Sequence, residues 1–184
     1  MNGWVTMLNQ LQIQANYGQY TGKEDPARVA VGLYYGARAR AWTKRLSAMV
    51  GGGSRRLLRL ADMTAGSVVH GSHHAGIREV PLDLIRGSEG RAEGFDTEMW
   101  PTDGQSRDRW VSVAASRERG VQLPPVELIQ VGDMYFVRDG HHRISVARAL
   151  GQAYIDAEVT VWEVDSLASR RASRSASELA LQPT

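Results

Sequence analysis

The sequence predicts an α+β fold, in which a basic helical segment over residues 1–63 precedes a mixed α/β domain over residues 80–164. Two observations support this class. A helical repeat follows Asp25 and Pro26, which suit the N-cap and the first turn of a helix. Farther along the chain, short apolar runs of strand composition alternate with helical patterns. We therefore expect helices first and a sheet with packed helices afterwards.

In the N-terminal segment, small and apolar residues recur at helical spacing. They are Ala30, Leu33, Tyr34, Ala37 and Ala41. Gly32 and Gly36 lie four residues apart and would let another helix approach closely. The helix should end at the glycines of residues 51–53, and a second helix should begin at Ser54. Residues 64–79 are rich in Gly, Ser and His, and we interpret them as a connector.

The second part contains several elements with clear boundaries. We predict a strand over residues 80–85, a helix over 107–119 ending before Gly120, a hairpin of 126–131 and 134–137 around Gly132 and Asp133, a helix from the Gly140 turn to Gly151, and a strand over 155–164. Residues 165–184 are of low complexity, and we expect them to be disordered.

Composition narrows the function classes. The chain has 184 residues and no cysteine, which excludes disulfides, thiolate zinc sites and cysteine nucleophiles. No apolar run approaches the roughly 18 residues of a membrane span, and the start of the chain lacks the order of a signal peptide, so we expect a soluble cytoplasmic protein. Residues 1–60 hold nine Lys or Arg against two acids, a balance of +7, within a total of +2. This segment should attract polyanions.

The most informative motif is the turn at Asp139 and Gly140, between a strand and a helix. The first amides of a helix lack intrahelical acceptors and carry partial positive charge, so they attract phosphate or carboxylate, and Arg143 can add a two-pronged contact. We predict that this motif binds an anionic cofactor through Arg138, Asp139, Gly140, His141, His142, Arg143 and Ser145.

Each of these residues also has a purely structural interpretation. Gly140 suits any tight strand-to-helix turn, and Asp139 suits a helix cap. Arg143 could pair with Asp139 or Asp156 instead of a ligand. His141 and His142 point about 100° apart on a helix, so we expect one of them to face the site, either as a catalytic acid or base or bonded to a nearby carbonyl.

Glu89 is the third catalytic candidate. It lies in a loop between Arg86 and Arg91, where a carboxylate could bind Mg²⁺ or activate a hydroxyl or water, or simply be solvated. His70, His73 and His74 invite comparison with a metal site, but Gly71 and Gly76 argue against a helix there, and we predict no protein metal site.

The order of elements over about residues 80–164, together with the Gly-His-His-Arg sequence of residues 140–143, resembles the ParB/sulfiredoxin superfamily. The corresponding turn reads Gly-Glu-Arg-Arg in ParB-like domains and Gly-Cys-His-Arg in sulfiredoxins. Gly140 and Arg143 match both patterns, whereas His141 stands where sulfiredoxins carry their reactive cysteine. The resemblance therefore implies a mixed-sheet, nucleotide-binding domain, without sulfinic-acid reduction by a thiol.

The same resemblance implies ATP, ADP or CTP with Mg²⁺ as the cofactor, and Arg91 as an arginine beside the nucleotide. Superfamily members include nucleases and kinases, so hydrolysis or phosphoryl transfer is an open alternative to binding alone. About twenty low-complexity residues follow the last predicted strand, so we expect no helix-turn-helix domain of the ParB type. Two further alternatives remain: a non-enzymatic module that binds nucleic acid or an acidic protein through residues 28–59, and a homo-oligomer assembled through Gly32 and Gly36.

Overall fold

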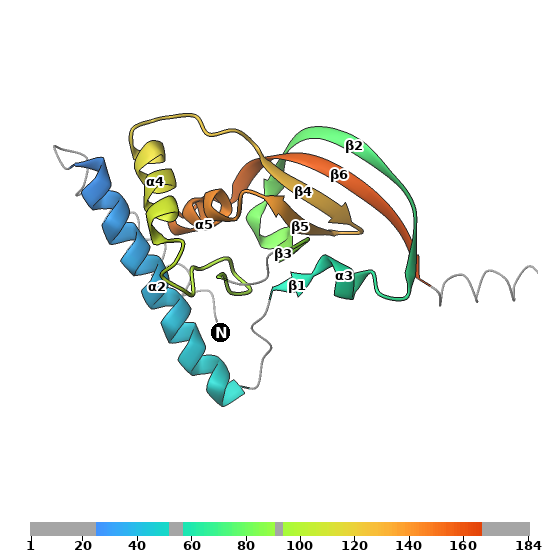
Figure 1. Cartoon of the computed structure of the whole chain (residues 1–184), viewed down its shortest axis with the longest axis horizontal. Coiled ribbons are helices and arrows are strands. Elements are labelled where there is room, and N and C mark those ends of the chain that lie inside the picture. The colour runs from blue at the N-terminus through green and yellow to red at the C-terminus, as the bar shows by residue number, and fades with distance from the viewer. Residues whose placement is uncertain (1–24, 52–56, 91–93, 167–184) are drawn as a thin grey trace, which may run out of the picture.

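A six-stranded mixed sheet is the centre of the fold, and the three longer helices are layered on one of its faces (Figure 1). The computed structural model describes residues 25–51, 57–90 and 94–166. Its elements are α2 (Pro26–Gly51), β1 (Leu58–Arg59), α3 (Leu60–Met63), β2 (Ser67–Pro81), the 3-10 helix η1 (Leu82–Leu84), β3 (Ile85–Ser88), α4 (Arg107–Glu118), β4 (Val126–Val131), β5 (Met134–Asp139), α5 (His141–Ala149) and β6 (Tyr154–Ser166).

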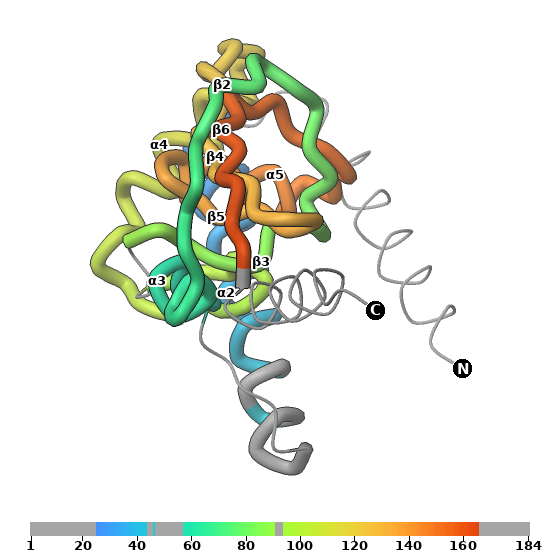
Figure 2. Tube along the Cα trace, turned by 90° about the vertical axis from the view of Figure 1, so that its right-hand side faces the viewer, coloured from blue at the N-terminus to red at the C-terminus, as the bar shows by residue number. Residues whose placement is uncertain are grey.

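The strands follow the order β1-β3-β5-β4-β6-β2. The β4–β5 and β6–β2 pairs are antiparallel, and the other three pairs are parallel. The structure confirms the α+β class, the hairpin, both predicted helices of the second part and the last strand. Figure 2 shows β6 beside β2, with which it pairs along most of its length, and β4 pairs with β6 over residues 157–161.

The central strand β4 is buried on both faces, which explains why its sequence does not alternate. Val126 and Leu128 belong to the main core beneath the helices, whereas Ile129 and Val131 belong to a smaller core on the opposite face, with Leu60 of α3. A strand covered on both sides reads as a continuous apolar run.

The helices pack in sequence onto the sheet, with α5 nearest, α4 beyond it and α2 outermost (Figure 1). Tyr34 of α2 packs edge-on against Trp110 of α4 at 5.5 Å between ring centroids. The Trp110 indole in turn donates a hydrogen bond of 2.8 Å to the Ser145 hydroxyl of α5. All three side chains are fully buried. The N-terminal helix and the mixed α/β part therefore share one hydrophobic core.

The prediction of a helix that begins at Ser54 is wrong over the first residues that the structure describes there. Leu58–Arg59 forms strand β1, and only Leu60–Met63 is helical. Residues 54–56 lie outside the described residues. Strand β1 pairs with β3 at Gly87, where an added Cβ would meet the Leu58 carbonyl oxygen at 2.3 Å. This close pairing, which requires glycine, overrides the local helical pattern.

The connector predicted for residues 64–79 is also wrong, because Ser67–Pro81 forms the longest strand, β2. Strand β2 lies at the edge of the sheet and pairs with β6, with register shifts between Val69 and Gly71 and between His74 and Ile77. Bulges at an edge tolerate the glycine-rich composition that suggested a loop.

The strand predicted for residues 80–85 is interrupted. Strand β2 ends at Pro81, a 3-10 turn follows, and β3 begins at Ile85. At the other end, β6 extends to Ser166, and the rest of the predicted disordered tail lies outside the described residues. Within the described ranges, no helix is both long enough and apolar enough to cross a membrane.

Candidate functional site

A cavity of about 820 Å³ lies at the start of α5. It is lined by α4, by the loop that leads into α4 and by the loop that follows α4. The side chains that give it its chemistry are Arg109, Arg138, His141, His142 and Arg143. This volume falls within the roughly 300–1,000 Å³ range of small-molecule sites. The structure thus brings the predicted turn residues to a hollow large enough for a ligand.

Gly140 makes the turn into α5. Its φ of 100° lies in the left-handed region, and a Cβ built there would meet Val126 Cγ1 at 2.5 Å. Its carbonyl accepts the first helical bond, from Ile144 N at 3.0 Å. Glycine is therefore needed both for the backbone conformation and for the approach of β4, and the turn sets the direction in which the first α5 amides point.

Arg143 is largely engaged in holding the site together. Its Nη1 donates to the carbonyls of Pro124 and Pro125, each at 2.6 Å, and its Nη2 donates to Asp139 Oδ2 at 2.5 Å. A guanidinium has five N–H donors, so these bonds use three of them. Arg143 therefore forms an ion pair with Asp139, which is the structural alternative to a ligand contact that the sequence suggested.

His141 is positioned by Ser88 at the end of β3. The Ser88 Oγ lies 2.8 Å from His141 Nε2 and 3.2 Å from the Val137 carbonyl oxygen. A hydroxyl has one proton, so if it is donated to the carbonyl, His141 Nε2 donates to Ser88 and Nδ1 carries the lone pair. Ser88 is buried, which makes it a support for the ring rather than a reacting group.

Phe95 separates the two histidine rings. It stacks on His141 at 5.8 Å and packs edge-on against His142 at 5.3 Å. Its loop is held by Asp96, whose carboxylate accepts the amides of Glu98 and Trp100, each at 2.9 Å. Phe95 was not among the site residues predicted from the sequence.

The same loop contains a strained residue. Met99 has a φ of 61° and is fully buried. A non-glycine residue rarely adopts this conformation, and the burial of its side chain in the main core stabilises the loop against the strain.

Glu89 and Arg138 form a two-pronged ion pair beside the cavity. Arg138 Nε and Nη2 donate to the two carboxylate oxygens at 2.9 and 3.2 Å. The bond to Glu89 raises the pKa of Arg138 above its ordinary value. Both oxygens of the Glu89 carboxylate are thus engaged by the Arg138 guanidinium.

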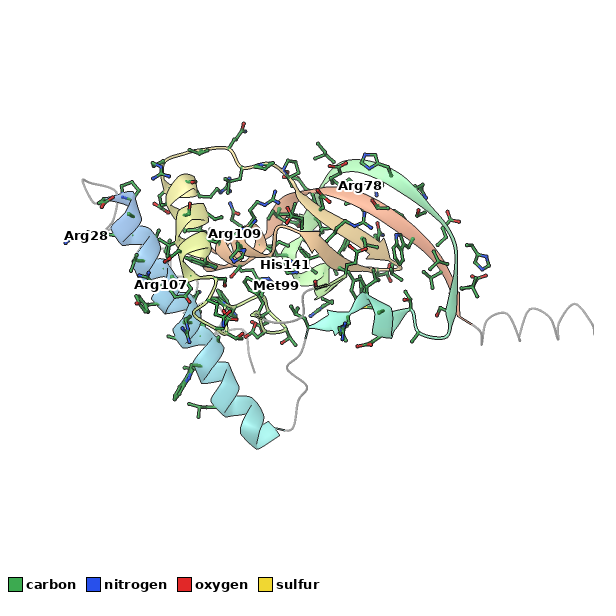
Figure 3. All side chains as sticks on the ribbon, in the orientation of Figure 1. Arg28, Arg78, Met99, Arg107, Arg109 and His141 are labelled. Carbon is green, nitrogen blue, oxygen red and sulfur yellow. The ribbon has the colours of Figure 1, made fainter. Side chains whose placement is uncertain are left out.

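Arg109 is the cationic residue that sequence reasoning missed. It lines the cavity from α4 and is exposed (Figure 3), and among the described residues no hydrogen bond or ion pair engages it. The signal was present in the spacing, since Ser106, Arg109 and Val113 recur on one helical face and all line the cavity.

One predicted cofactor contact is not brought to the cavity. Ser145 is fully buried and accepts the bond from Trp110, so its position is that of a packing residue. Arg91 lies outside the described residues. The three histidines of β2 each face a carboxylate of β6, at 3.0, 3.6 and 3.7 Å, rather than one another.

The cavity does not present a dedicated metal cage. In the described ranges, no three His, Asp or Glu side chains are grouped so that they could hold a metal ion. The nearby carboxylates of Glu89 and Asp139 are bonded to arginines. Mg²⁺ typically needs only one or two carboxylates when it arrives with phosphates, and Asp139, which lines the cavity and bonds Arg143 through Oδ2, is the carboxylate that would supply a ligand.

Comparison with solved structures finds sulfiredoxin from Arabidopsis thaliana, at 21% identity and a TM-score of 0.35, over 52% of this chain and 93% of that chain. No protein-family model matches the chain, and no curated protein matches it. A likeness this low does not show a shared site or activity.

Proposed function

We propose that this protein binds a nucleoside di- or triphosphate in the cavity at the start of α5. The observation that carries the proposal is Arg109, an arginine without a partner among the described residues, placed in the same hollow as the first turn of α5. Three arginines and a helix N-terminus around one cavity favour a ligand with several negative oxygens.

Each part of the cavity has a role in this proposal. The amides after Gly140 and the Arg109 guanidinium would hold phosphate oxygens, and the donors of Arg143 not used by Asp139 and the proline carbonyls would add to them. The phosphates would bring Mg²⁺ with them. If turnover follows, His141 is better suited than Glu89 to move a proton, because Glu89 is bonded to Arg138 through both oxygens.

The test is calorimetric titration of ATP, ADP, CTP and GTP, each with Mg²⁺, into the wild type, Arg109→Ala and Arg119→Ala. Arg119 is the matched control: its side chain bonds to Ser116 at the far end of α4 and does not line the cavity. A charge-assisted hydrogen bond is worth about 1.5–3 kcal/mol, so Arg109→Ala should weaken binding by about tenfold or more. Arg119→Ala should bind like the wild type.

Arg143→Ala is a poorer probe, because it also releases the two proline carbonyls and Asp139. A salt titration separates this proposal from nucleic-acid binding by the basic segment, since polyanion binding falls steeply with ionic strength. Absence of a signal for all four nucleotides, or equal affinity of wild type and Arg109→Ala, would overturn the proposal.

A further inference from the structure

The face of α2 that points away from the domain is uncharged from residue 32 to residue 46. The inner face is anchored by the buried residues Ala30, Tyr34 and Ala37. At about 100° per residue, the exposed residues of the opposite face fall within about 120° of the helix circumference. We call this set the outer stripe: Gly32, Tyr35, Gly36, Ala39, Trp42 and Leu46. Thr43 lies in the same sector, and its hydroxyl donates to the Arg40 carbonyl at 3.0 Å.

The outer stripe carries three large apolar side chains in a row. Tyr35 is 57% exposed, Trp42 63% and Leu46 52%. Scattered apolar residues are normal on a surface, but an aligned row of them indicates a contact surface.

The two glycines form a notch beside this row. Among the described residues, no atom lies within 4 Å of a Cβ added at Gly32 or Gly36. Glycine destabilises a helix interior relative to alanine. Because no described atom is close to either glycine, packing within the described domain does not explain why glycine stands at these two positions. Small residues on a helix surface allow a second helix to approach closely.

Helix α2 is also longer than α4, the helix that packs against it. Its 26 residues span about 39 Å, whereas the 12 residues of α4 span about 18 Å. Figure 1 shows the C-terminal half of α2 running past α4, and this half contains Trp42 and Leu46. Helices in water are stabilised mainly by packing of an apolar face, and among the described side chains of this half only Ala41 packs against the hydrophobic core.

The charges around the outer stripe decide its partner. Arg28 is exposed one turn before Gly32 on the same side, and the Arg107 guanidinium lies 5.9 Å from the Tyr35 ring centre (Figure 3). The sequence of α2 contains five basic residues and no acidic one. A second copy would bring like charges together, and a nucleic acid would match the charge but not the glycine notch beside an apolar row.

We propose that the outer stripe docks an amphipathic helix of another protein, whose apolar seam is flanked by Asp or Glu. The seam would cover Tyr35, Trp42 and Leu46, and the acidic flanks would meet the arginines beside the stripe. Apart from the contact between Tyr35 and Arg107, this surface lies on the opposite side of α2 from Tyr34, which packs against α4. It does not depend on the nucleotide cavity.

The test uses the full chain and two labelled synthetic helical peptides with the same leucine seam, one with Glu flanks and one with Lys flanks. Fluorescence anisotropy should show binding of the Glu peptide and binding about tenfold or more weaker for the Lys peptide. Arg109→Ala should bind the Glu peptide like the wild type, which keeps this test separate from the nucleotide proposal.

Two variants examine the stripe itself. Trp42→Ser removes an exposed apolar anchor. Gly36→Leu fills the notch, where no described atom lies within 4 Å of the added Cβ, so both variants should fold. Each should weaken binding of the Glu peptide by about tenfold. Tyr154→Ser is the matched control, because it removes an aromatic ring that is 56% exposed on β6. Circular dichroism checks that α2 is intact in each variant.

Four results would overturn the inference. They are failure of the Glu peptide to bind; equal binding of the two peptides; self-association in sedimentation that Gly36→Leu abolishes, which would identify a second copy as the occupant; and Trp42-dependent binding of a 20-nucleotide oligo-dT in place of the Glu peptide, which would identify a nucleic acid.

Discussion

Replacing Gly140 by alanine is the sharpest test of how the turn before α5 is built. The substitution adds one methyl group at the position where the strand, the helix and the cavity meet. Its Cβ would lie 2.5 Å from Val126 Cγ1 and 2.8 Å from Val126 Cβ, and the backbone there has a φ of 100°. Both a conformational and a steric penalty therefore apply.

The two penalties can be given magnitudes. A non-glycine residue in the left-handed region costs about 1–2 kcal/mol. Forcing an extra carbon into a packed core costs about 1–3 kcal/mol, and Val126 of β4 is fully buried in the main core. We expect Gly140→Ala to lower the free energy of unfolding by about 2–5 kcal/mol, a large share of the roughly 5–15 kcal/mol of a typical domain.

Gly120→Ala is the matched control. Gly120 also has a positive φ, 74°, but no atom of the described ranges lies within 4 Å of a Cβ added there. Gly120→Ala should therefore lower the free energy of unfolding only by the conformational penalty, about 1–2 kcal/mol. In the background of Val126→Ala, which removes the Cγ1 atom but leaves Cβ, the penalty of Gly140→Ala should shrink without vanishing.

The assay is urea denaturation followed by tryptophan fluorescence, with equal m-values required among the variants. Equal destabilisation by Gly140→Ala and Gly120→Ala would refute the steric part of this reasoning. A Gly140→Ala penalty unchanged by Val126→Ala would show that the strain arises elsewhere.

Two further substitutions test how the helices are held. Ser145→Ala leaves the buried Trp110 indole N–H without its acceptor at 2.8 Å, and we expect a loss of about 1–3 kcal/mol in urea denaturation; the exposed Ser112→Ala should change stability by less than about 0.5 kcal/mol, and equal stability of the two variants would contradict the role of the bond. Asp25→Ala removes the carboxylate that accepts a hydrogen bond from the Ala27 amide at 3.0 Å. It should lower the free energy of unfolding by about 0.5–2 kcal/mol and reduce the helical circular dichroism signal. Asp25→Asn can still cap the helix and should retain most of that stability.

Several elements could be predicted because short-range chemistry decides them. The hairpin around Gly132 and Asp133 forms because a two-residue turn with a positive φ, here 57° at Gly132, matches the twist of paired strands. The turn at Gly140 and the cap at Asp25 are equally local. In each case the residues that set the structure lie within a few positions of one another.

The strand β2 could not be predicted, because its partner is remote. Ser67 pairs with Ser166 and Pro81 with Tyr154, so the composition of residues 64–79 carries no sign of the strand. The short strand β1 likewise depends on contact with Gly87. Periodicity and propensity report on neighbours along the chain, and tertiary pairing overrides them.

The candidate site divides in the same way. The sequence by itself determined that a glycine turn would open a helix with His141, His142 and Arg143 on its first turn, since dihedral preferences and helix ends are local properties. Only the tertiary structure decided which cations remain available there: packing ties Arg143 to the Pro124 carbonyl and to Asp139, and it brings Arg109 across from α4. A side chain's donors are shared among whatever groups folding places around it, and that placement is not encoded in its immediate neighbours.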